Sequence, residues 1–432
     1  MKNYEKELKK ILKSFEQNKD IQNESIRKEK LKNLILNSFK TELIDRYKTS
    51  IKNVEQFEKE LIQTLENKKF FVYGAGGGGF IFFKNFCEEY KIYPKAFLDK
   101  EDKGDFYKSF LKINGCVIVK SLSNKFKELN RSLPVVIAVG KKELQKEIIS
   151  FLKKEGFKKI ITIPEEFWRK WYSQELDKVL SLWFWETFIK IEHYFEKFKE
   201  NLLKIIEFFD ENKSKEILVT HVKQFLFLEK ENINFEPLEQ HYFPEDIKME
   251  KGYNVFIDCG AYLGDTVYYL SKHIGKIDTL VCFEPNLEFY KALTKYLNED
   301  YEKIAKNIIS IPCGVYSEET IIKFVNTSAG DSHITFDRGN EEIMVVVLDR
   351  VLSGIVPTFI KMDIEGTELE ALKGAKRIIK TYKPDLAICV YHNPMDLVEI
   401  PFYLKKLVPE YKFYLRKYGE QPLTELVLYA TV

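Results

Sequence analysis

Apolar positions along the chain follow two different periods. In residues 1–66, which contain neither Pro nor Gly, apolar side chains recur close to the 3.6-residue period of a helix, among many Lys, Glu, Asn and Gln residues. We expect two or more amphipathic helices here, which either cover the next domain or serve as an arm for self-association. From Lys69 onward, short apolar runs alternate with amphipathic stretches, a pattern typical of strands and helices in α/β proteins.

Two blocks of alternating strands and helices are expected, at residues 67–165 and 251–432, joined by a helical connector at 166–250 that holds all four tryptophans. Strands of the first block are predicted at 70–73, 95–99, 116–119, 134–140 and 159–163, and those of the second at 254–258, 280–284, 308–312, 359–363 and 386–390. An antiparallel hairpin of 411–416 and 424–429 would complete the second sheet. The predicted fold class is therefore α/β, with two Rossmann-like, doubly wound sheets.

A glycine loop follows the first strand of the 67–165 block. Gly74, Gly76 and Gly79 keep the G-x-G-x-x-G spacing, and Asp99 comes 25 positions after Gly74 (99 minus 74). An acid at this place can bond a ribose hydroxyl, as in a dinucleotide fold. The block resembles small Rossmann-like domains fused to sugar-modifying enzymes of bacterial surface-glycan clusters. It either binds a nucleotide or nucleotide sugar, or retains only the fold.

The turn at the start of the second block carries the strongest candidate chemistry. The strand ending at Asp258 is followed by Gly260 and Ala261 and then by a helix, so backbone N–H groups lie beside a carboxylate. A pyrophosphate would be repelled by this acid, which disfavours a dinucleotide. Glu284 ends the second strand, 26 positions after Asp258 (284 minus 258), where a carboxylate can accept both hydroxyl protons of a ribose. The combination favours S-adenosylmethionine.

Four motifs in this block carry a likeness to a known family. They are Phe256-Ile-Asp-Cys-Gly-Ala-Tyr-Leu-Gly-Asp-Thr266, Phe283-Glu-Pro-Asn286, Ile360-Lys-Met-Asp-Ile-Glu-Gly-Thr-Glu368 and Val390-Tyr-His-Asn-Pro-Met-Asp396. With them, residues from about 200 to 432 resemble the FkbM family of methyltransferases, whose members mostly O-methylate sugars, glycans or polyketides. The resemblance implies that Asp258, Gly260 and Ala261 hold the methionine end of the cofactor. It likewise implies that Glu284 holds the ribose and that the backbone around Cys313 flanks the adenine. Asn286, in the same motif as Glu284, is also a candidate cofactor-binding residue.

The end of the fourth strand is where a methyl acceptor should meet the cofactor. Methyl transfer needs the acceptor oxygen in line with the S–CH₃ bond, so positioning supplies much of the rate. Asp363 is the first candidate for a general base or acceptor anchor, and His392 is the second. Asp363, Glu365 and Glu368 could also bind Mg²⁺ through carboxylate oxygens, but the family likeness does not demand a metal and none is predicted.

Composition narrows the class of protein. The chain has 432 residues, is 45% apolar and has a formal net charge of +2, which indicates a soluble protein of two or three domains without nucleic acid as its main partner. The six cysteines form no C-x-x-C pair, so we expect reduced core residues. Because neither a signal peptide nor a run of about 18 apolar residues is evident, a cytoplasmic protein without a membrane span is expected.

The predicted function is S-adenosylmethionine-dependent O-methylation of a hydroxyl on a sugar, nucleotide-sugar or glycan intermediate. The alternative is a nucleotide-sugar-binding scaffold, or an NAD(P)-dependent oxidoreductase that uses the glycine loop, with an inactive methyltransferase domain. Apart from a small-molecule or glycan acceptor, a nucleotide or nucleotide sugar at the first block and a second copy of the chain are open as partners.

Overall fold

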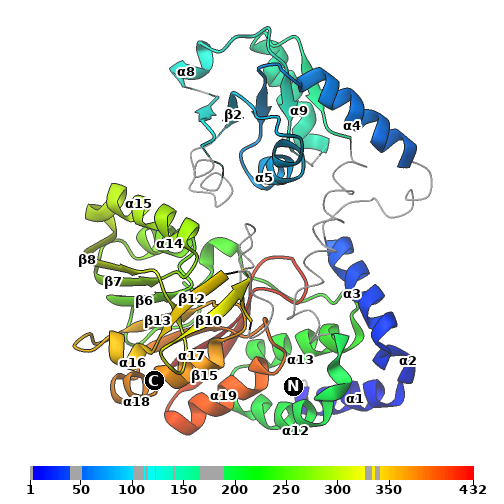
Figure 1. The fold of residues 1–432 in the computed structure, drawn as a ribbon. Helices are drawn as coiled ribbons and strands as arrows, with labels where there is room; N and C mark the ends of the chain where they lie inside the picture. The colour runs from blue at the N-terminus through cyan, green and yellow to red at the C-terminus, as the bar shows by residue number, and fades with distance from the viewer. Residues whose placement is uncertain are drawn as a thin grey trace. The chain divides into compact units, whose positions relative to one another are not determined.

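The computed structural model describes residues 3–38, 51–100, 111, 115–121, 123–139, 142–164, 189–325, 333–335 and 341–432. The chain divides into two compact units, which are visible in Figure 1. One unit is Thr41–Val179, and the other combines Met1–Lys40 with Leu180–Val432.

A five-stranded parallel sheet forms the centre of the unit at Thr41–Val179. The elements described in this unit are α4 (Ile51–Leu65), β1 (Phe71–Tyr73), α5 (Gly77–Phe82), the π-helix η2 (Phe83–Cys87), α6 (Glu88–Tyr90), β2 (Ala96–Asp99), β3 (Ile118–Lys120), α8 (Asn124–Lys127), β4 (Val135–Ile137), α9 (Lys142–Lys154) and β5 (Ile160–Thr162). In the strand order β3-β2-β1-β4-β5, β1 lies in the middle. β2 and β3 follow on one side of β1, and the chain then returns to add β4 and β5 on the other side. This order confirms the doubly wound sheet predicted for the first block.

A mixed seven-stranded sheet forms the centre of the other unit. Its strands are β6 (Val255–Cys259), β7 (Ile277–Phe283), β8 (Ala305–Ile311), β13 (Phe359–Met362), β14 (Asp385–Cys389), β15 (Lys412–Lys417) and β16 (Leu426–Thr431), in the order β15-β16-β14-β13-β6-β7-β8. β16 runs antiparallel to both β14 and β15, and the other pairings are parallel. The predicted strands and the closing hairpin are therefore present.

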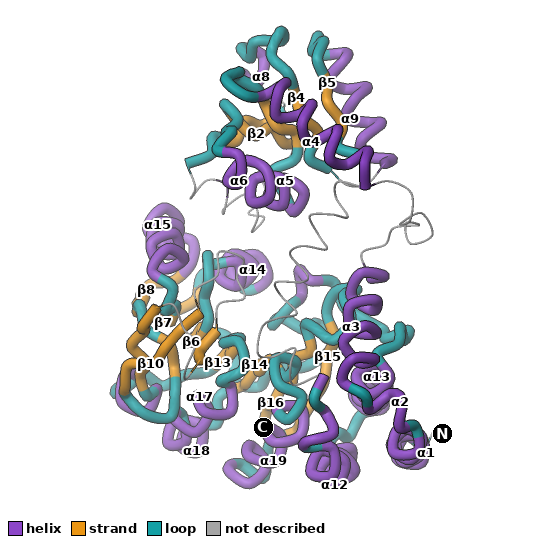
Figure 2. The backbone as a smooth tube through the Cα atoms, turned by 45° about the vertical axis from the view of Figure 1, so that its right-hand side comes forward, coloured by secondary structure: helices purple, strands orange, loops and turns teal. Residues whose placement is uncertain are grey.

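Helices cover both faces of the seven-stranded sheet (Figure 2). They are α14 (Asp265–His273), α15 (Leu287–Ile304), α16 (Leu348–Val351), α17 (Glu368–Gly374), α18 (Lys376–Tyr382) and α19 (Asp396–Leu407). The chain runs from β6 outward to β8 and then returns to β13 on the other side of β6. Because crossovers between parallel strands are right-handed, this reversal puts α14 and α15 on one face and α17, α18 and α19 on the other.

A second, four-stranded sheet lies in the same unit and was not predicted. It contains β9 (Gly314–Val315), β10 (Thr320–Val325), β11 (His333–Thr335) and β12 (Glu341–Val346), in the order β11-β10-β12-β9. Ile322, Ile343 and Val345 pack together on its buried side. On the opposite side, Ile321 and Met344 are 61% and 57% exposed, so the usual alternation of apolar and polar residues is absent.

The first helices of the chain pack against the connector that precedes the seven-stranded sheet. The elements are α1 (Tyr4–Gln17), α2 (Lys19–Gln22), α3 (Glu24–Ser38), α12 (Phe195–Ile205) and α13 (Asn212–Phe227). The ring centroids of Phe15 and Phe195 lie 4.8 Å apart, and the buried guanidinium of Arg27 donates to the carbonyl of Leu226 at 2.7 Å. The expected helical region 1–66 is thus divided, with α1–α3 in one compact unit and α4 in the other.

The segment boundaries and the absence of a membrane span were also predicted from the sequence. The four tryptophans of the 166–250 segment lie outside the described residues, and the exact boundaries of the four predicted segments stay a prediction. None of the helices that the structure describes combines the length and the apolar character needed to cross a bilayer.

Candidate functional site

A cavity opens at the carboxyl ends of β6, β7 and β13. β6 pairs with β7 on one side and β13 on the other, so this edge is the point where the strand order reverses and where ligands of open α/β sheets bind. The cavity and the open solvent at its mouth together comprise about 780 Å³ of empty space. It is lined by Gly260, Tyr262, Asp265, Phe283, Glu284, Pro285, Phe289, Cys313, Gly314, Val315, Lys361, Asp363, Ile364, Glu365 and Thr367.

Glycine is required in the turn between β6 and α14. Gly260 has φ +82°, and a Cβ added there would lie 1.9 Å from the carbonyl oxygen of Asp363. The turn after β6 therefore packs directly on the backbone that follows β13. Any L-residue at this position would combine an unfavourable backbone conformation with a steric clash.

Asp258 and Lys361 form a buried ion pair beneath this turn. They are register partners on β6 and β13, and the Lys361 Nζ lies 3.1 Å from the Asp258 Oδ1. The same Nζ donates to the Gly260 carbonyl at 2.6 Å. Burial raises the pKa of Asp258 to about 6 although the Lys361 ammonium opposes the shift. Burial would lower the pKa of Lys361, but the carboxylates of Asp258, Asp363 and Asp265 raise it, so the ammonium stays charged.

Glu284 lies in the middle of the cavity, directly after β7. Its Oε2 accepts from the Tyr262 N–H at 2.9 Å and its Oε1 accepts from the Asn286 N–H at 2.8 Å. Burial raises the pKa of Glu284 to about 7 despite these two hydrogen bonds. Each carboxylate oxygen has a second lone pair, so the group can accept further hydrogen bonds from a ligand.

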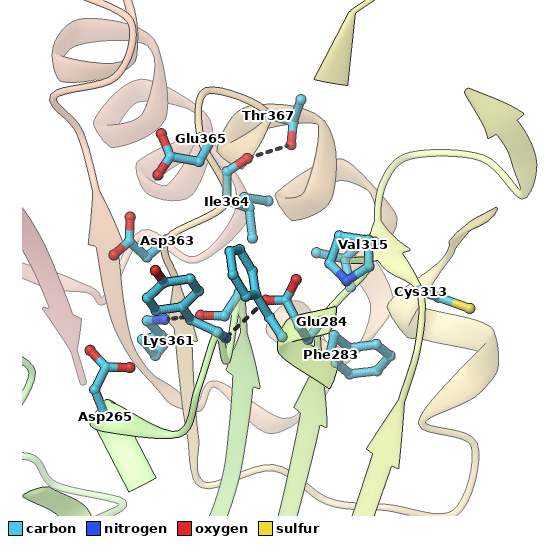
Figure 3. A pocket seen from close by; sticks show the side chains of 15 residues that line it. Asp265, Phe283, Glu284, Cys313, Val315, Lys361, Asp363, Ile364, Glu365 and Thr367 are labelled. Atoms are coloured by element: carbon cyan, nitrogen blue, oxygen red, sulfur yellow. Dashed lines mark hydrogen bonds between the residues drawn. The ribbon is translucent and has the colours of Figure 1, made fainter. Parts of the chain in front are cut away.

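The two ends of the cavity differ in polarity (Figure 3). Asp265, Lys361, Asp363 and Glu365 lie at one end. Phe283, Cys313 and Val315 lie at the other, and Glu284 lies between the two groups. The cavity therefore suits a ligand that is charged at one end, carries hydroxyls in its middle and is apolar at the other end.

Asp363 lies at the charged end and accepts hydrogen bonds from two tyrosine hydroxyls. Its Oδ2 accepts from the Tyr242 hydroxyl at 2.7 Å, and its Oδ1 accepts from the Tyr391 hydroxyl at 3.4 Å. Burial would raise the pKa of Asp363, but the charges of Lys361 and His392 and the Tyr242 hydrogen bond hold it at about 2. At neutral pH the group is an ionised acceptor and a weak base.

His392 lies behind the charged end, in the loop between β14 and α19. Its imidazole is 1% exposed, and its Nδ1 lies 2.8 Å from the Glu368 Oε1. Its Nε2 faces Asp363 Oδ1 and Glu365 Oε2, each at 3.4 Å. Burial lowers the pKa of His392, but Glu368, Glu365 and Asp363 outweigh this and raise it to about 10.

The predicted cofactor and acceptor residues separate into two groups in the structure. Gly260, Glu284, Cys313 and Asp363 line the cavity. The other predicted residues are buried behind its wall: Asp258, Ala261, Asn286 and His392. Asn286 caps the start of α15, where its Oδ1 accepts from the Glu288 N–H at 2.9 Å. These residues support the cavity through its backbone and its charged side chains.

Sequence reasoning missed Asp265, Lys361 and Tyr242. Asp265 opens α14 and lines the charged end, within a motif that was recognised for other residues. Lys361 is a charged residue inside the apolar run of β13, a signal that a buried counter-ion must lie nearby. Tyr242 could not be found from its local sequence, because its contact with Asp363 joins positions 121 residues apart.

The glycine loop and Asp99 lie next to each other in the unit at Thr41–Val179, and nucleotide binding by them stays a prediction. Asp99 ends β2, and its Oδ2 accepts from the Ala75 N–H at 2.8 Å, inside the loop that contains Gly76. A Cβ at Gly79 would lie 2.2 Å from the Gly74 carbonyl, and one at Gly74 would lie 2.6 Å from the Ala138 carbonyl. Gly74 and Gly79 thus permit close packing of the loop, which a domain that only retains the fold would also need.

The comparisons with known proteins place the seven-stranded sheet in a class. Residues 258–420 match the methyltransferase FkbM domain, the family that the four motifs predicted. Among solved structures, the chain is similar to a methyltransferase FkbM from Methylobacillus flagellatus KT, with 21% identity, 87% of this chain and 92% of that chain covered, and a TM-score of 0.47.

Two further similarities have lower identities and lower TM-scores. An rRNA methylase from Streptococcus thermophilus has 12% identity over 41% of this chain and 84% of its own, with a TM-score of 0.27. Aeropyrum pernix fibrillarin, in complex with natively bound S-adenosyl-L-methionine, has 10% identity over 44% of this chain and 70% of its own, with a TM-score of 0.28. No curated protein matches the chain.

Proposed function

We propose that the cavity binds S-adenosylmethionine and that the protein methylates a hydroxyl of a sugar, nucleotide-sugar or glycan intermediate. The observation that carries the cofactor assignment is the order of groups along the cavity. Charged side chains at one end, Glu284 in the middle and Phe283 and Val315 at the other end match an amino-acid group, a ribose and an adenine in turn. When bound, the cofactor supplies a methyl group on a positively charged sulfur.

The charged end contains groups suited to an amino acid. The Asp265 carboxylate at the start of α14 can bind an ammonium. The Lys361 ammonium can bind a carboxylate, because an ammonium carries three donors and the contacts with Asp258 and Gly260 use two of them. Asp258 then acts by holding Lys361 in place.

The acceptor is assigned to the side of the cavity formed by the Asp363–Glu365 backbone. The family that residues 258–420 match motivates a hydroxyl of a sugar or glycan as the acceptor. The ionised Asp363 carboxylate would accept the hydrogen bond of that hydroxyl and orient its oxygen. With its pKa held at about 2, Asp363 fits the part of acceptor anchor better than that of a base at neutral pH.

Isothermal titration of the full chain with S-adenosylmethionine tests the cofactor assignment. We expect one site per chain and a loss of at least about tenfold in affinity for Glu284→Gln, because a ribose hydroxyl then loses a charged acceptor. Glu288→Gln is the matched control, since Glu288 is an exposed acid four residues further on. Absence of binding by the wild type, or equal affinity in Glu284→Gln, would remove the assignment.

The acceptor assignment is tested by methyl transfer from radiolabelled S-adenosylmethionine to a panel of nucleotide sugars and glycan intermediates. Asp363→Asn should keep cofactor affinity within about threefold and lose at least about 100-fold in turnover, because positioning of the acceptor is lost. If the wild type labels no compound of the panel, the acceptor does not belong to this class. Unchanged turnover in Asp363→Asn removes Asp363 from the acceptor site.

A second candidate function belongs to the unit at Thr41–Val179. The observation in its favour is that the Asp99 carboxylate lies at the glycine loop and bonds the Ala75 N–H. A nucleotide or nucleotide sugar bound there would make this unit a recognition module, or an NAD(P)-dependent oxidoreductase if the methyltransferase domain is inactive. Titration with NAD(P) and with nucleotide sugars, using Asp99→Asn as the variant, separates these readings from an empty fold. A cytoplasmic location and self-association remain predictions.

A further inference from the structure

Three side chains with ligand atoms for a metal converge beside the cofactor cavity. Asp363 and Glu365 follow β13, and His392 follows β14. One ligand atom from each lies within 4.8 Å of the other two. The His392 Nε2 is 3.4 Å from Asp363 Oδ1 and 3.4 Å from Glu365 Oε2. Since metal–ligand bonds are about 2.0–2.2 Å, a small cation between these atoms needs only modest side-chain adjustment.

Glu368 fixes the orientation of the imidazole. Its Oε1 lies 2.8 Å from the His392 Nδ1, and the residue is fully buried. The same carboxylate accepts from the Ile364 N–H and the Gly366 N–H, both at 3.0 Å. Glu368 therefore ties the imidazole to the loop that carries the two carboxylates. A carboxylate bonded to the far nitrogen of a histidine is the usual support of a metal-bound imidazole, because it fixes the tautomer that presents Nε2.

The backbone of Glu365 has an unusual conformation. Its φ is +58°, in the left-handed region that a residue with a side chain seldom adopts. The following Gly366 is also left-handed, with φ +97°. The Glu365 Oε2 lies 3.4 Å from the His392 Nε2 in this conformation, and backbone strain of this kind is concentrated at functional sites.

We infer that Asp363, Glu365 and His392 bind a divalent cation of the Mn²⁺ or Mg²⁺ class, which takes the place of the proton on the His392 Nε2; that proton is released to water. Two carboxylates and one imidazole, with positions left for water or substrate oxygen, suit such a cation better than Cu⁺ or a zinc–thiolate centre. The nearby acids Asp258 and Asp265 oppose the charge of Lys361, so a further cation is electrostatically tolerated at this end of the cavity. Glu368 is a positioning residue for His392.

The location of the cation site suggests its use, and this part of the inference rests on the proposed function. Asp363 and Glu365 line the cavity, so a cation held by them would be in reach of the acceptor hydroxyl. Coordination of that oxygen would favour loss of its proton to water and would fix its direction. A diol of a sugar is a suitable bidentate ligand for such an ion.

Binding of Mn²⁺ alone to the full-length, EDTA-treated protein tests the cation site without cofactor or acceptor. Electron paramagnetic resonance of free Mn²⁺ should show one bound ion per chain, and pulsed spectra of the bound ion should show coupling to an imidazole nitrogen. Glu365→Gln should weaken binding at least about tenfold, and Glu368→Gln by a similar factor. Glu370→Gln, which removes a partly exposed acid of α17, should bind as the wild type does.

Absence of bound Mn²⁺ in the wild type overturns the inference, as does a bound ion without nitrogen coupling. Affinity that is equal in wild type and in a folded Glu365→Gln also overturns it. If that variant does not fold, the presence or absence of nitrogen coupling in the wild type still shows whether His392 binds the ion. Binding of S-adenosylmethionine is measured in a separate titration in the presence of EDTA. If the protein does not bind S-adenosylmethionine, the Mn²⁺ measurement still shows whether the cation site exists.

Discussion

At the scale of single residues, the site depends on charges that are buried together. Lys361 lies on a central strand, where it neutralises Asp258 and bonds the turn that carries Gly260. Its Nζ also lies 5.2 Å from the centre of the Tyr242 ring, a cation–π contact. The chain thus keeps an ammonium at the cavity wall only because its partners are fixed by strand register and by the loop at Tyr242.

Lys361→Met should be strongly destabilising, because it leaves the Asp258 carboxylate buried without its counter-ion. We expect the free energy of unfolding to fall by about 3–5 kcal/mol. The double variant Asp258→Leu/Lys361→Met should recover part of this loss, since no charge is then buried alone. Urea unfolding of the single and double variants measures the coupling, and a double variant that is as unstable as the sum of the single ones contradicts the ion pair.

Because of Glu284, we expect cofactor affinity and folding stability to change in opposite directions with pH. Its folded pKa, raised by burial to about 7, favours the neutral form, so its contribution to stability is present below the unfolded pKa and is lost as pH rises through 7. A ribose is bound best by the ionised carboxylate, so cofactor affinity should rise about tenfold between about pH 6 and 8. Titrations at several pH values should show this slope in the wild type and not in Glu284→Gln.

Candidate site residues could be predicted where the neighbouring sequence alone marks them. Asp258, Gly260 and Glu284 could be recognised because each directly follows or ends an apolar strand. Tyr242, Lys361 and the convergence of Glu365 with His392 depend on pairing between distant strands and loops, which sequence periodicity does not encode. The role given to Asn286 illustrates the same limit, since the structure uses its side chain to cap α15.

At the scale of elements, the strand-to-helix turns determine how closely the sheet edge can pack. The turn after β6 and the loop after β13 touch through Gly260 and the Asp363 carbonyl. The strands themselves were predictable because parallel strands buried on both faces are nearly continuous apolar runs. The sheet of β9 to β12 could not be predicted in this way, because Ile321 and Met344 are exposed apolar residues on its outer face.

Gly260→Ala tests this packing, and Gly275→Ala is its matched control. Both glycines have similar φ values, +82° and +84°, but a Cβ at Gly275 meets no atom within 4 Å. Backbone strain alone should cost about 1–2 kcal/mol in each variant. The clash in Gly260→Ala should add at least about 2 kcal/mol and weaken cofactor binding. Equal thermal stability of the two variants would show that the contact with Asp363 is absent.

At the scale of the whole molecule, the compact units do not follow the order of the sequence. Residues 1–40 belong with the methyltransferase domain, although the unit at Thr41–Val179 separates them from it along the chain. Amphipathic periodicity predicted the helices at the start of the chain but could not say which domain they cover. That choice is made by tertiary contacts, such as those of Phe15 with Phe195 and of Arg27 with α13.

Arg27→Ala should therefore destabilise the unit that contains the methyltransferase domain. The buried guanidinium donates to the carbonyls of Leu226 at 2.7 Å and Phe225 at 3.2 Å, and its loss leaves both acceptors buried. We expect a loss of about 2–4 kcal/mol in the unfolding free energy. Lys30→Ala removes only an ion pair with the exposed Glu229 and should cost less than about 1 kcal/mol. Similar unfolding curves for both variants would place α3 outside the cooperative unit.

A crystal structure of the full chain with S-adenosylhomocysteine tests most directly whether the cavity binds the cofactor in the proposed orientation. We expect the ribose hydroxyls within about 3.2 Å of the Glu284 carboxylate, the adenine between Phe283 and Val315, and the amino-acid group at Asp265 and Lys361. Adenine at the charged end, or the nucleoside bound away from Glu284, would contradict it.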